Sequence, residues 1–524
     1  MSSPELPPEL WLEVLIHLPA DSLRQSSLVS RTFADLSREL RFATFQLHPY
    51  VLDDNDYSSL QPTLLPPAEI IDGALARLEF WTSRVVAPHI RRCVVSPWLL
   101  SLIDEPGWEC APTETPYTVL EAFLPRLQGL MGLQSLHMEG LYLEWTHLAA
   151  LPALQTLKVE DVTLPDTLPE NLKQTLTVGA FYLSDIHLSN RSCVGAWMRL
   201  LNPALLRSLS LICPMPGLDA TYPLVTTLFL QWHSFLRMSE LLRLLCRFPA
   251  LLRLHLQTVR FVQDSESQSF DLALPTLSRL AISGPCELLP AFLSDAACPQ
   301  LTHVEVNNST VERFLVGMTP QRNFQATIVT SLTLNLSYVL YMREISYTRL
   351  STILDPFPAL TVADMCFNCT ILDDGPIYAN PLPFKFFESL GTSSAALPRA
   401  LARLAVRWWL PYDGDWTTPD DCDSGSGAGS ESESESTSLR PLVQHGATES
   451  AMRRVCEALR TPCSALRDVY ADAYNLFGYR WQVFSGAGII REEFISNSDV
   501  LWYDSLQLLR EKWAAEWGIP SSEA

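Results

Sequence analysis

Cysteine and histidine spacing gives the first test for metal-binding or catalytic chemistry in this chain. Cys366 and Cys369 form a C-x-x-C pair, but no second pair follows at zinc-finger spacing, so buried thiols are expected. The 10 histidines do not cluster. The chain also lacks a glycine-rich phosphate loop, a G-x-S-x-G elbow and an H-E-x-x-H motif. The sequence therefore predicts no catalytic residue, no metal and no cofactor. A cysteine nucleophile with a distant histidine base stays open, without local support.

Composition predicts a folded chain of two or three domains. Of the 524 residues, 47% are hydrophobic and 18% are charged, which permits a large core. The net charge of −21 disfavours binding to nucleic acid or to an anionic membrane, because both select clustered lysine and arginine. No secretory signal and no apolar run of membrane-spanning length is visible. A cytoplasmic or nuclear location, or both, is expected.

The first 47 residues show an unusual density of apolar helical positions. Leu10, Val14 and Leu18 repeat at i, i+4 and i+8, while Leu12 and Ile16 lie on another side of the same predicted helix. A helix that is apolar nearly all round is buried on more than one face. Three short helices make little core of their own, so the surplus apolar surface should be covered by something else. The rest of this chain is the simplest cover, and a partner protein is the alternative.

The order of motifs in this stretch resembles the F-box. Leu6-Pro7 is followed by an aliphatic helix, then by Leu18-Pro19, Leu23 and Val29-Ser30-Arg31 with the aromatic Phe33. The resemblance implies a three-helix module that docks on the Skp-family adaptor of a cullin-RING ubiquitin ligase, the SCF complex. It also implies an adaptor-binding set made of Leu6, Pro7, Leu10, Leu15, Leu18, Leu23, Val29 and Phe33.

The pattern L-x-x-L-x-L, with aliphatic substitutes, recurs along the chain at spacings that are mostly about 20–30 residues. Clear copies begin at Leu133, Leu154, Leu206, Val225, Leu251, Leu277, Leu301 and Val329. Leu-Pro or Phe-Pro precedes several copies, and helical stretches fill several of the gaps between copies. This repeating order of strand, turn and helix is typical of a solenoid. The pattern resembles irregular leucine-rich repeats. The expected fold is α/β, an N-terminal F-box followed by a solenoid with parallel strands on the concave side and helices on the convex side.

The residue between the last two apolar positions of each copy should face away from the core. These residues are predicted to line the concave surface that receives a protein substrate. Phe229, with Trp232 just beyond its strand, is a large aromatic of the kind found at binding hot spots. If the register slips by one residue, however, Phe229 becomes a core residue. The predicted substrate-binding set is His137, Lys158, Phe229, Trp232, His255 and Glu305.

A Ser/Glu-rich acidic tract interrupts the repeats and is expected to be disordered, because it cannot bury apolar area. A predicted helix with an aromatic-rich stripe follows near the end of the chain, where a solenoid needs a cap. The predicted domains are the F-box at 4–47, a linker and connecting helix at 48–88, and the solenoid at 89–411. They continue with the acidic insertion at 412–440, and a C-terminal repeat with its capping helix at 441–524.

Together these features predict a non-enzymatic substrate-recognition subunit of an SCF-type ubiquitin ligase. Its expected partners are a Skp-family adaptor, a cullin reached through that adaptor, and an unknown protein substrate, with no nucleic acid and no membrane. A scaffold that binds partners without delivering them for ubiquitination is the alternative. An enzyme with a cryptic site is the third and least supported interpretation.

Overall fold

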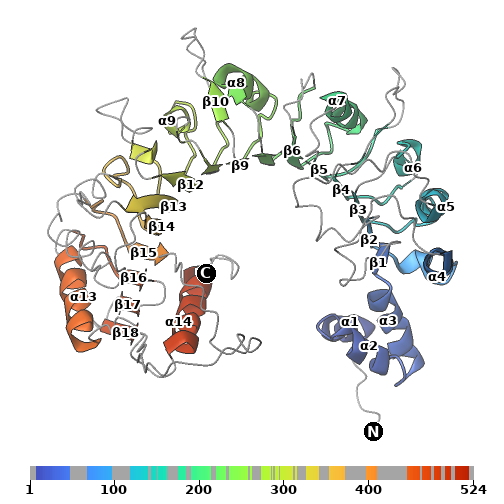
Figure 1. Ribbon diagram of the computed structural model, residues 1–524, viewed down its shortest axis with the longest axis horizontal. Coiled ribbons are helices and arrows are strands. Elements are labelled where there is room, and N and C mark those ends of the chain that lie inside the picture. The colour runs from blue at the N-terminus through green and yellow to red at the C-terminus, as the bar shows by residue number, and fades with distance from the viewer. Residues whose placement is uncertain are drawn as a thin grey trace, which may run out of the picture. The chain divides into compact units, whose positions relative to one another are not determined.

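In the computed structural model (Figure 1), the chain forms two compact units, Met1–Leu251 and Leu252–Ala524. The structure describes residues 7–47, 68–96, 118–139, 143–149, 151–160, 162, 164, 175–184, 191–213, 220–231, 235–257, 260–262, 273–284, 286, 289–293, 296–310, 313–315, 326–340, 353–371, 397–409, 445–460, 463–473, 477–484, 490–496 and 502–517. None of the helices in these ranges has both the length and the apolar character that a membrane crossing requires.

The first unit begins with three short helices that pack on one another. They are α1 (Pro8–Leu15), α2 (Ala20–Ser26) and α3 (Arg31–Arg41). Pro7 precedes α1 and Pro8 occupies its first turn, where a missing N–H group costs no hydrogen bond. Ser30 caps α3 by accepting a hydrogen bond from the backbone N–H of Phe33 at 3.2 Å.

A parallel sheet follows in the first unit, with strand order β1-β2-β3-β4-β5-β6-β7. Its strands are β1 (Thr44–Leu47), β2 (Arg92–Val95), β3 (Ser135–Glu139), β4 (Thr156–Glu160), β5 (Ala180–Ser184), β6 (Ser208–Ile212) and β7 (Thr227–Gln231). Helices on one side of these strands are visible in Figure 1: α4 (Ala68–Trp81), α5 (Thr118–Leu127), α6 (Thr146–Ala149), α7 (Arg191–Leu200) and α8 (Met238–Leu245). The unit also contains the 3-10 helix η1 (Ala87–His89) and the short strand β8 (Phe235–Arg237).

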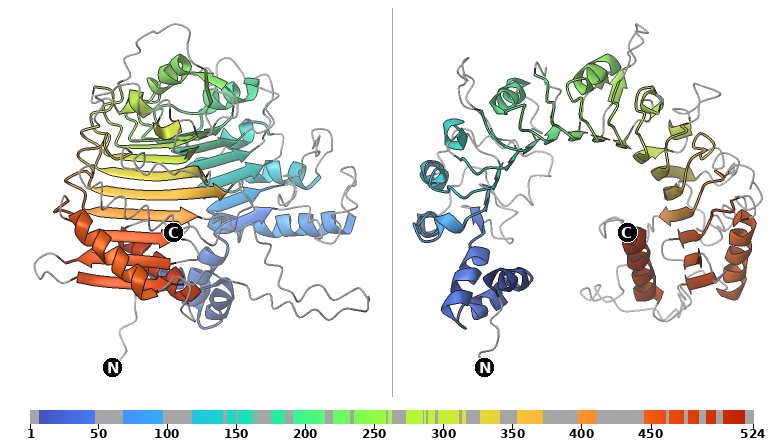
Figure 2. Two further views of the ribbon diagram at one scale, coloured as in Figure 1. Left: turned by 60° about the vertical axis from the view of Figure 1, so that its left-hand side comes forward. Right: turned by 180° about the vertical axis from the view of Figure 1, so that it is seen from behind.

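The second unit also contains a sheet, with strand order β9-β11-β12-β13-β14-β15-β16-β17-β18. Figure 2 shows its strands lying side by side. They are β9 (Arg253–Gln257), β11 (Arg279–Ser283), β12 (His303–Thr310), β13 (Ser331–Leu340), β14 (Val362–Ile371), β15 (Arg403–Trp409), β16 (Asp468–Ala473), β17 (Phe477–Val483) and β18 (Ile490–Ser496). The unit also contains β10 (Arg260–Val262), α9 (Leu289–Phe292), α13 (His445–Arg460) and α14 (Trp502–Trp517).

Buried and half-buried or exposed side chains alternate along β3, β4, β6, β7 and β9. In β3, Leu136 and Met138 are fully buried, and Leu157 and Val159 repeat this arrangement in β4. The leucines of the L-x-x-L-x-L pattern therefore face the core. The residues between them lie on the opposite face, called the polar face from here on. The predicted register is confirmed at these strands.

Two parts of the sheet depart from the sequence expectation. The predicted F-box range also contains β1, whose residues Phe45 and Leu47 are buried and pair with β2. The expected C-terminal repeat continues as an antiparallel hairpin, because β16 pairs with β17 and β17 with β18 in opposite directions. Only a few residues separate these strands, whereas a parallel crossover needs a dozen or more.

The final helix forms within the predicted C-terminal range, and the structure shows which face of the sheet it covers. Leu509, Trp513 and Ala514 of α14 form one buried cluster with Ala405 and Tyr470, which belong to the polar face of β15 and β16. The helix α13 contributes Cys456 and Leu459 to the opposite side of the same strands. The cap therefore covers the polar face, whereas a simple continuation of the repeats would leave that face exposed.

Candidate functional site

The three N-terminal helices enclose a small core. Leu15 of α1 is only 2% exposed and Leu23 of α2 is also buried. Trp11 contacts the edge of Phe33 with ring centroids 4.9 Å apart, which joins α1 to α3. These side chains hold the helices together, so they cannot also offer much area to a partner.

Around this core, five large apolar side chains remain exposed. We call them the apolar docking surface: Leu10, Val14 and Ile16 from α1 and its end, and Leu28 and Val29 from the turn before α3. Leu28 is 84% exposed and Val29 is 73% exposed. Single exposed apolar residues are ordinary, but five on one module of about 45 residues make these positions a candidate interaction site.

The predicted adaptor-binding residues divide into four groups. Pro7, Leu10 and Val29 are exposed, and Leu18 and Phe33 are half-buried. Leu15 and Leu23 lie in the interior of the module, and Leu6 lies outside the described residues. Val14, Ile16 and Leu28 of the apolar docking surface were not in the predicted set. For Leu28, its position beside Val29 in a turn between two helices was the available signal.

On the polar face of the first unit, strand register brings a second set of residues together. His137, Lys158, Tyr182, Ser210 and Phe229 are successive neighbours across β3 to β7. His137, Lys158 and Phe229 were predicted for this face. Tyr182 was missed because β5 lacks the leucine pattern, and the alternation of Phe181 and Leu183 was the available signal.

Glu160 connects the polar side chains of β3, β4 and β5. His137 Nε2 lies 3.0 Å from Glu160 Oε2, and Lys158 Nζ lies 2.8 Å from Glu160 Oε1. The Lys158 ammonium also lies 4.9 Å from the centroid of the Tyr182 ring. The hydrogen bond from His137, reinforced by Lys158, lowers the pKa of Glu160 to about 2. Burial, together with this carboxylate, raises the pKa of Tyr182.

These groups have the chemistry of a polar binding surface. Ligand atoms of His137, Glu139 and Glu160 lie within 4.8 Å of one another, and this donor set suits a divalent metal. However, the Lys158 ammonium already neutralises Glu160 and competes with a metal for the same carboxylate. The arrangement therefore supports recognition of hydrogen-bonding side chains better than it supports metal binding.

The remaining predicted substrate residues lie on the second unit or outside the described residues. His255 and Glu305 belong to one row of the polar face, with Ala281 between them. Burial lowers the pKa of His255, and Glu305 opposes that effect. Trp232 lies outside the described residues, so its pairing with Phe229 stays a prediction.

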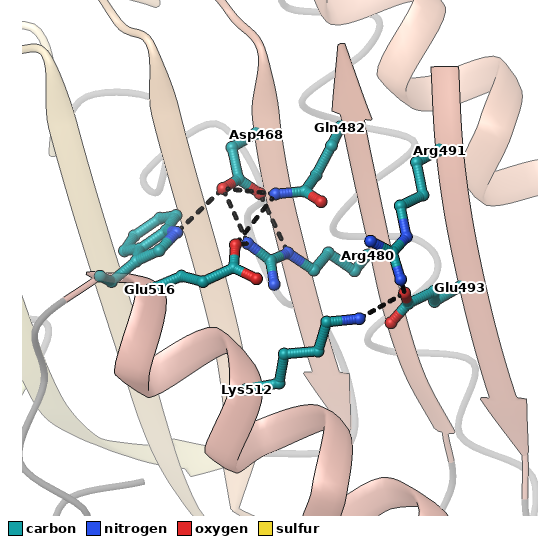
Figure 3. A network of polar contacts seen from close by, with 8 residues as sticks. Asp468, Arg480, Gln482, Arg491, Glu493, Lys512 and Glu516 are labelled. Carbon is teal, nitrogen blue, oxygen red and sulfur yellow. Dashed lines mark hydrogen bonds and ion pairs between the residues drawn. The ribbon is translucent and has the colours of Figure 1, made fainter. Parts of the chain in front are cut away.

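Figure 3 shows how α14 is attached to the end of the second unit. Arg480 donates to Asp468 at 3.1 Å and to Glu516 of α14 at 2.6 Å. Asp468 also accepts a hydrogen bond from the indole N–H of Trp517 at 3.0 Å. Lys512 of α14 lies 2.7 Å from Glu493 of β18. Ion pairs therefore occupy this part of the polar face, with Arg480 and Asp468 buried and Glu516, Lys512 and Glu493 partly exposed.

Comparison with known families identifies the N-terminal module. Residues 3–45 match the F-box domain, so the chain carries an F-box at the position of α1 to α3. None of the curated proteins compared with the chain matches it.

Proposed function

We propose that this protein is a substrate-recognition subunit of an SCF-type ubiquitin ligase. The observation that carries the proposal is an F-box whose apolar docking surface remains exposed in the folded chain. F-box domains bind Skp-family adaptors, and such proteins are typically non-catalytic. The chain would supply proximity between a bound substrate and a transfer reaction catalysed elsewhere.

The repeat strands support the second half of this proposal. They present half-buried polar and aromatic groups in one register, which suits a protein surface held against the polar face. We interpret residues 89–411 as an irregular leucine-rich solenoid and assign the substrate to its polar face. The cytoplasm, the nucleus or both would be the site of action.

Adaptor capture tests the proposal directly. Leu10→Glu combined with Val29→Glu should abolish capture of a Skp-family adaptor, because each side chain would bury apolar area worth roughly 1.5–3 kcal/mol. Leu205→Glu is the matched control, since Leu205 is similarly exposed but lies outside the F-box. Unchanged adaptor capture by the double variant would contradict the assigned surface.

Co-purification separates the competing functions. Recovery of adaptor and cullin together supports a ligase subunit, whereas recovery of adaptor without cullin favours the scaffold alternative. Proximity labelling with the proteasome inhibited would then identify the substrate.

A further inference from the structure

Two arginines and a histidine stand in one row at the start of neighbouring strands in the second unit. Arg253 of β9 pairs with Arg279 of β11, which pairs with His303 of β12. All three are exposed and lie on the polar face. Neighbouring strands are about 4.8 Å apart, so the three groups occupy about 10 Å of surface. We call Arg253, Arg279 and His303 the cationic row.

The row is unfavourable for folding by itself. Like charges directly opposite one another on adjacent strands destabilise a sheet. Neither Arg253 nor Arg279 forms an ion pair with a carboxylate within the described residues. The chain as a whole carries a net charge of −21, so acidic side chains were abundant enough to pair with them. The exposed arginines of the row, which have no carboxylate partner among the described residues, are therefore available to an anionic ligand.

The neighbours of the row leave its donors available. Glu305 occupies the next row and accepts a hydrogen bond from the Asn307 amide on its own strand. His303 Nδ1 lies 2.8 Å from the Thr302 hydroxyl, which orients the ring. Burial, and then the charge of Arg279, lowers the pKa of His303. Ser331 continues the row on β13 and adds a hydroxyl group.

We propose that the cationic row docks an acidic segment of a protein substrate through its aspartate and glutamate carboxylates. That the bound protein is a ligase substrate rests on the proposed function, whereas the binding of an acidic segment does not. The planar guanidinium fork of arginine matches the two oxygens of a carboxylate. An extended segment places alternate side chains about 7 Å apart on one face, so two or three acidic residues reach the whole row. The acidic remainder of the chain repels such a segment elsewhere and makes the row its preferred position.

Fluorescence anisotropy on the full-length protein tests the proposal. The probe is a fluorescein-labelled ten-residue peptide of alternating glutamate and serine. We expect binding that weakens as salt is raised from 50 to 300 mM, because exposed charges are screened. Arg253→Gln combined with Arg279→Gln should weaken binding at least tenfold. Arg399→Gln combined with Arg467→Gln, which alters two other exposed arginines of the same unit, should leave it unchanged.

Several outcomes would overturn the proposal. These are equal affinity of the two double variants, absence of binding to the wild-type chain, or equal binding of a lysine–serine peptide. Binding of a phosphoserine peptide without binding of the glutamate peptide would replace carboxylate recognition by phosphate recognition. Adaptor capture by the Arg253→Gln, Arg279→Gln variant separates the two proposals. If this variant still captures the adaptor but no longer binds the peptide, the cationic row acts in peptide binding alone. If the wild type binds the peptide but fails to capture the adaptor, only the ligase assignment is rejected.

Discussion

The polar face of the second unit holds its charges in two different settings. Near β9 to β12, Arg253, Arg279 and His303 are exposed, and the two arginines stand directly beside each other as like charges. Near β15 to β18, Arg407 and Arg480 of the sheet and Arg510 of α14 are largely buried, and each has a carboxylate partner. Burial accounts for the difference, since a charge removed from water must be paired, whereas an exposed charge can remain available to a ligand.

The buried pair between Arg510 of α14 and Asp472 of β16 should show the largest effect on stability. Arg510 Nη2 donates to Asp472 Oδ1 at 2.9 Å. Arg510→Leu leaves a buried carboxylate without its cation and should lower the free energy of unfolding by about 3–5 kcal/mol. Urea unfolding measures the loss.

Two variants sharpen this first test. Asp472→Leu combined with Arg510→Leu should lose less stability than Arg510→Leu alone, because no unpaired charge remains. Arg491→Leu removes a half-exposed partner of Glu493 and should cost at most about 1 kcal/mol. Equal losses in all three variants would show that burial does not determine the value of these pairs.

The Glu160 carboxylate should make the stability of the first unit dependent on pH. Its pKa is about 2 in the folded chain, below the ordinary value of 4.5. A lowered pKa stabilises the fold above about pH 4.5, and this contribution, about 2–3 kcal/mol, is lost as the pH falls toward 2. Thermal melts of the wild type and Glu160→Gln should therefore differ most above pH 5 and converge under acid. A difference independent of pH would exclude a role for the carboxylate charge.

Phe229 and Trp513 allow an aromatic side chain on the polar face to be compared with a fully buried one. Trp513 of α14 is fully buried and stacks on Tyr470 at 4.3 Å, so Trp513→Ala should cost about 3–5 kcal/mol. Phe229 is half-buried on the polar face, so Phe229→Ala should cost clearly less and should weaken substrate capture. Leu228→Ala, at the adjacent core position, is the control for a core loss of about 2–5 kcal/mol. A Phe229 loss equal to that of Leu228 would reassign the aromatic to the core.

The cationic row should show the smallest effect on stability. Arg279→Gln removes the like charge that stands beside Arg253, so the melting temperature should stay the same or rise slightly. Differential scanning fluorimetry at low salt is sufficient to measure it. A marked fall in melting temperature would mean that the row is structural, in contrast to the binding role proposed above.

Local pattern determined much of this protein. The order of Leu, Pro and aromatic residues before residue 45 predicted the F-box, and the family comparison supports it. The spacing of leucines predicted which residues of β3, β4, β7, β9 and β12 would face the core and which would share the polar face. These features follow from side-chain alternation over a few residues, which the sequence displays directly.

Tertiary structure decided what depends on contacts between distant segments. The burial of Leu15 and Leu23, as opposed to the exposure of Leu28, depends on how three helices pack. The position of α14 over the polar face depends on charge pairs such as Arg510 with Asp472, which join residues 38 positions apart. The local sequence pattern does not predict such a pair, because a charged residue fits the same pattern whether it is exposed or buried in an ion pair. Only packing shows which arginines are paired and which remain available to bind a ligand.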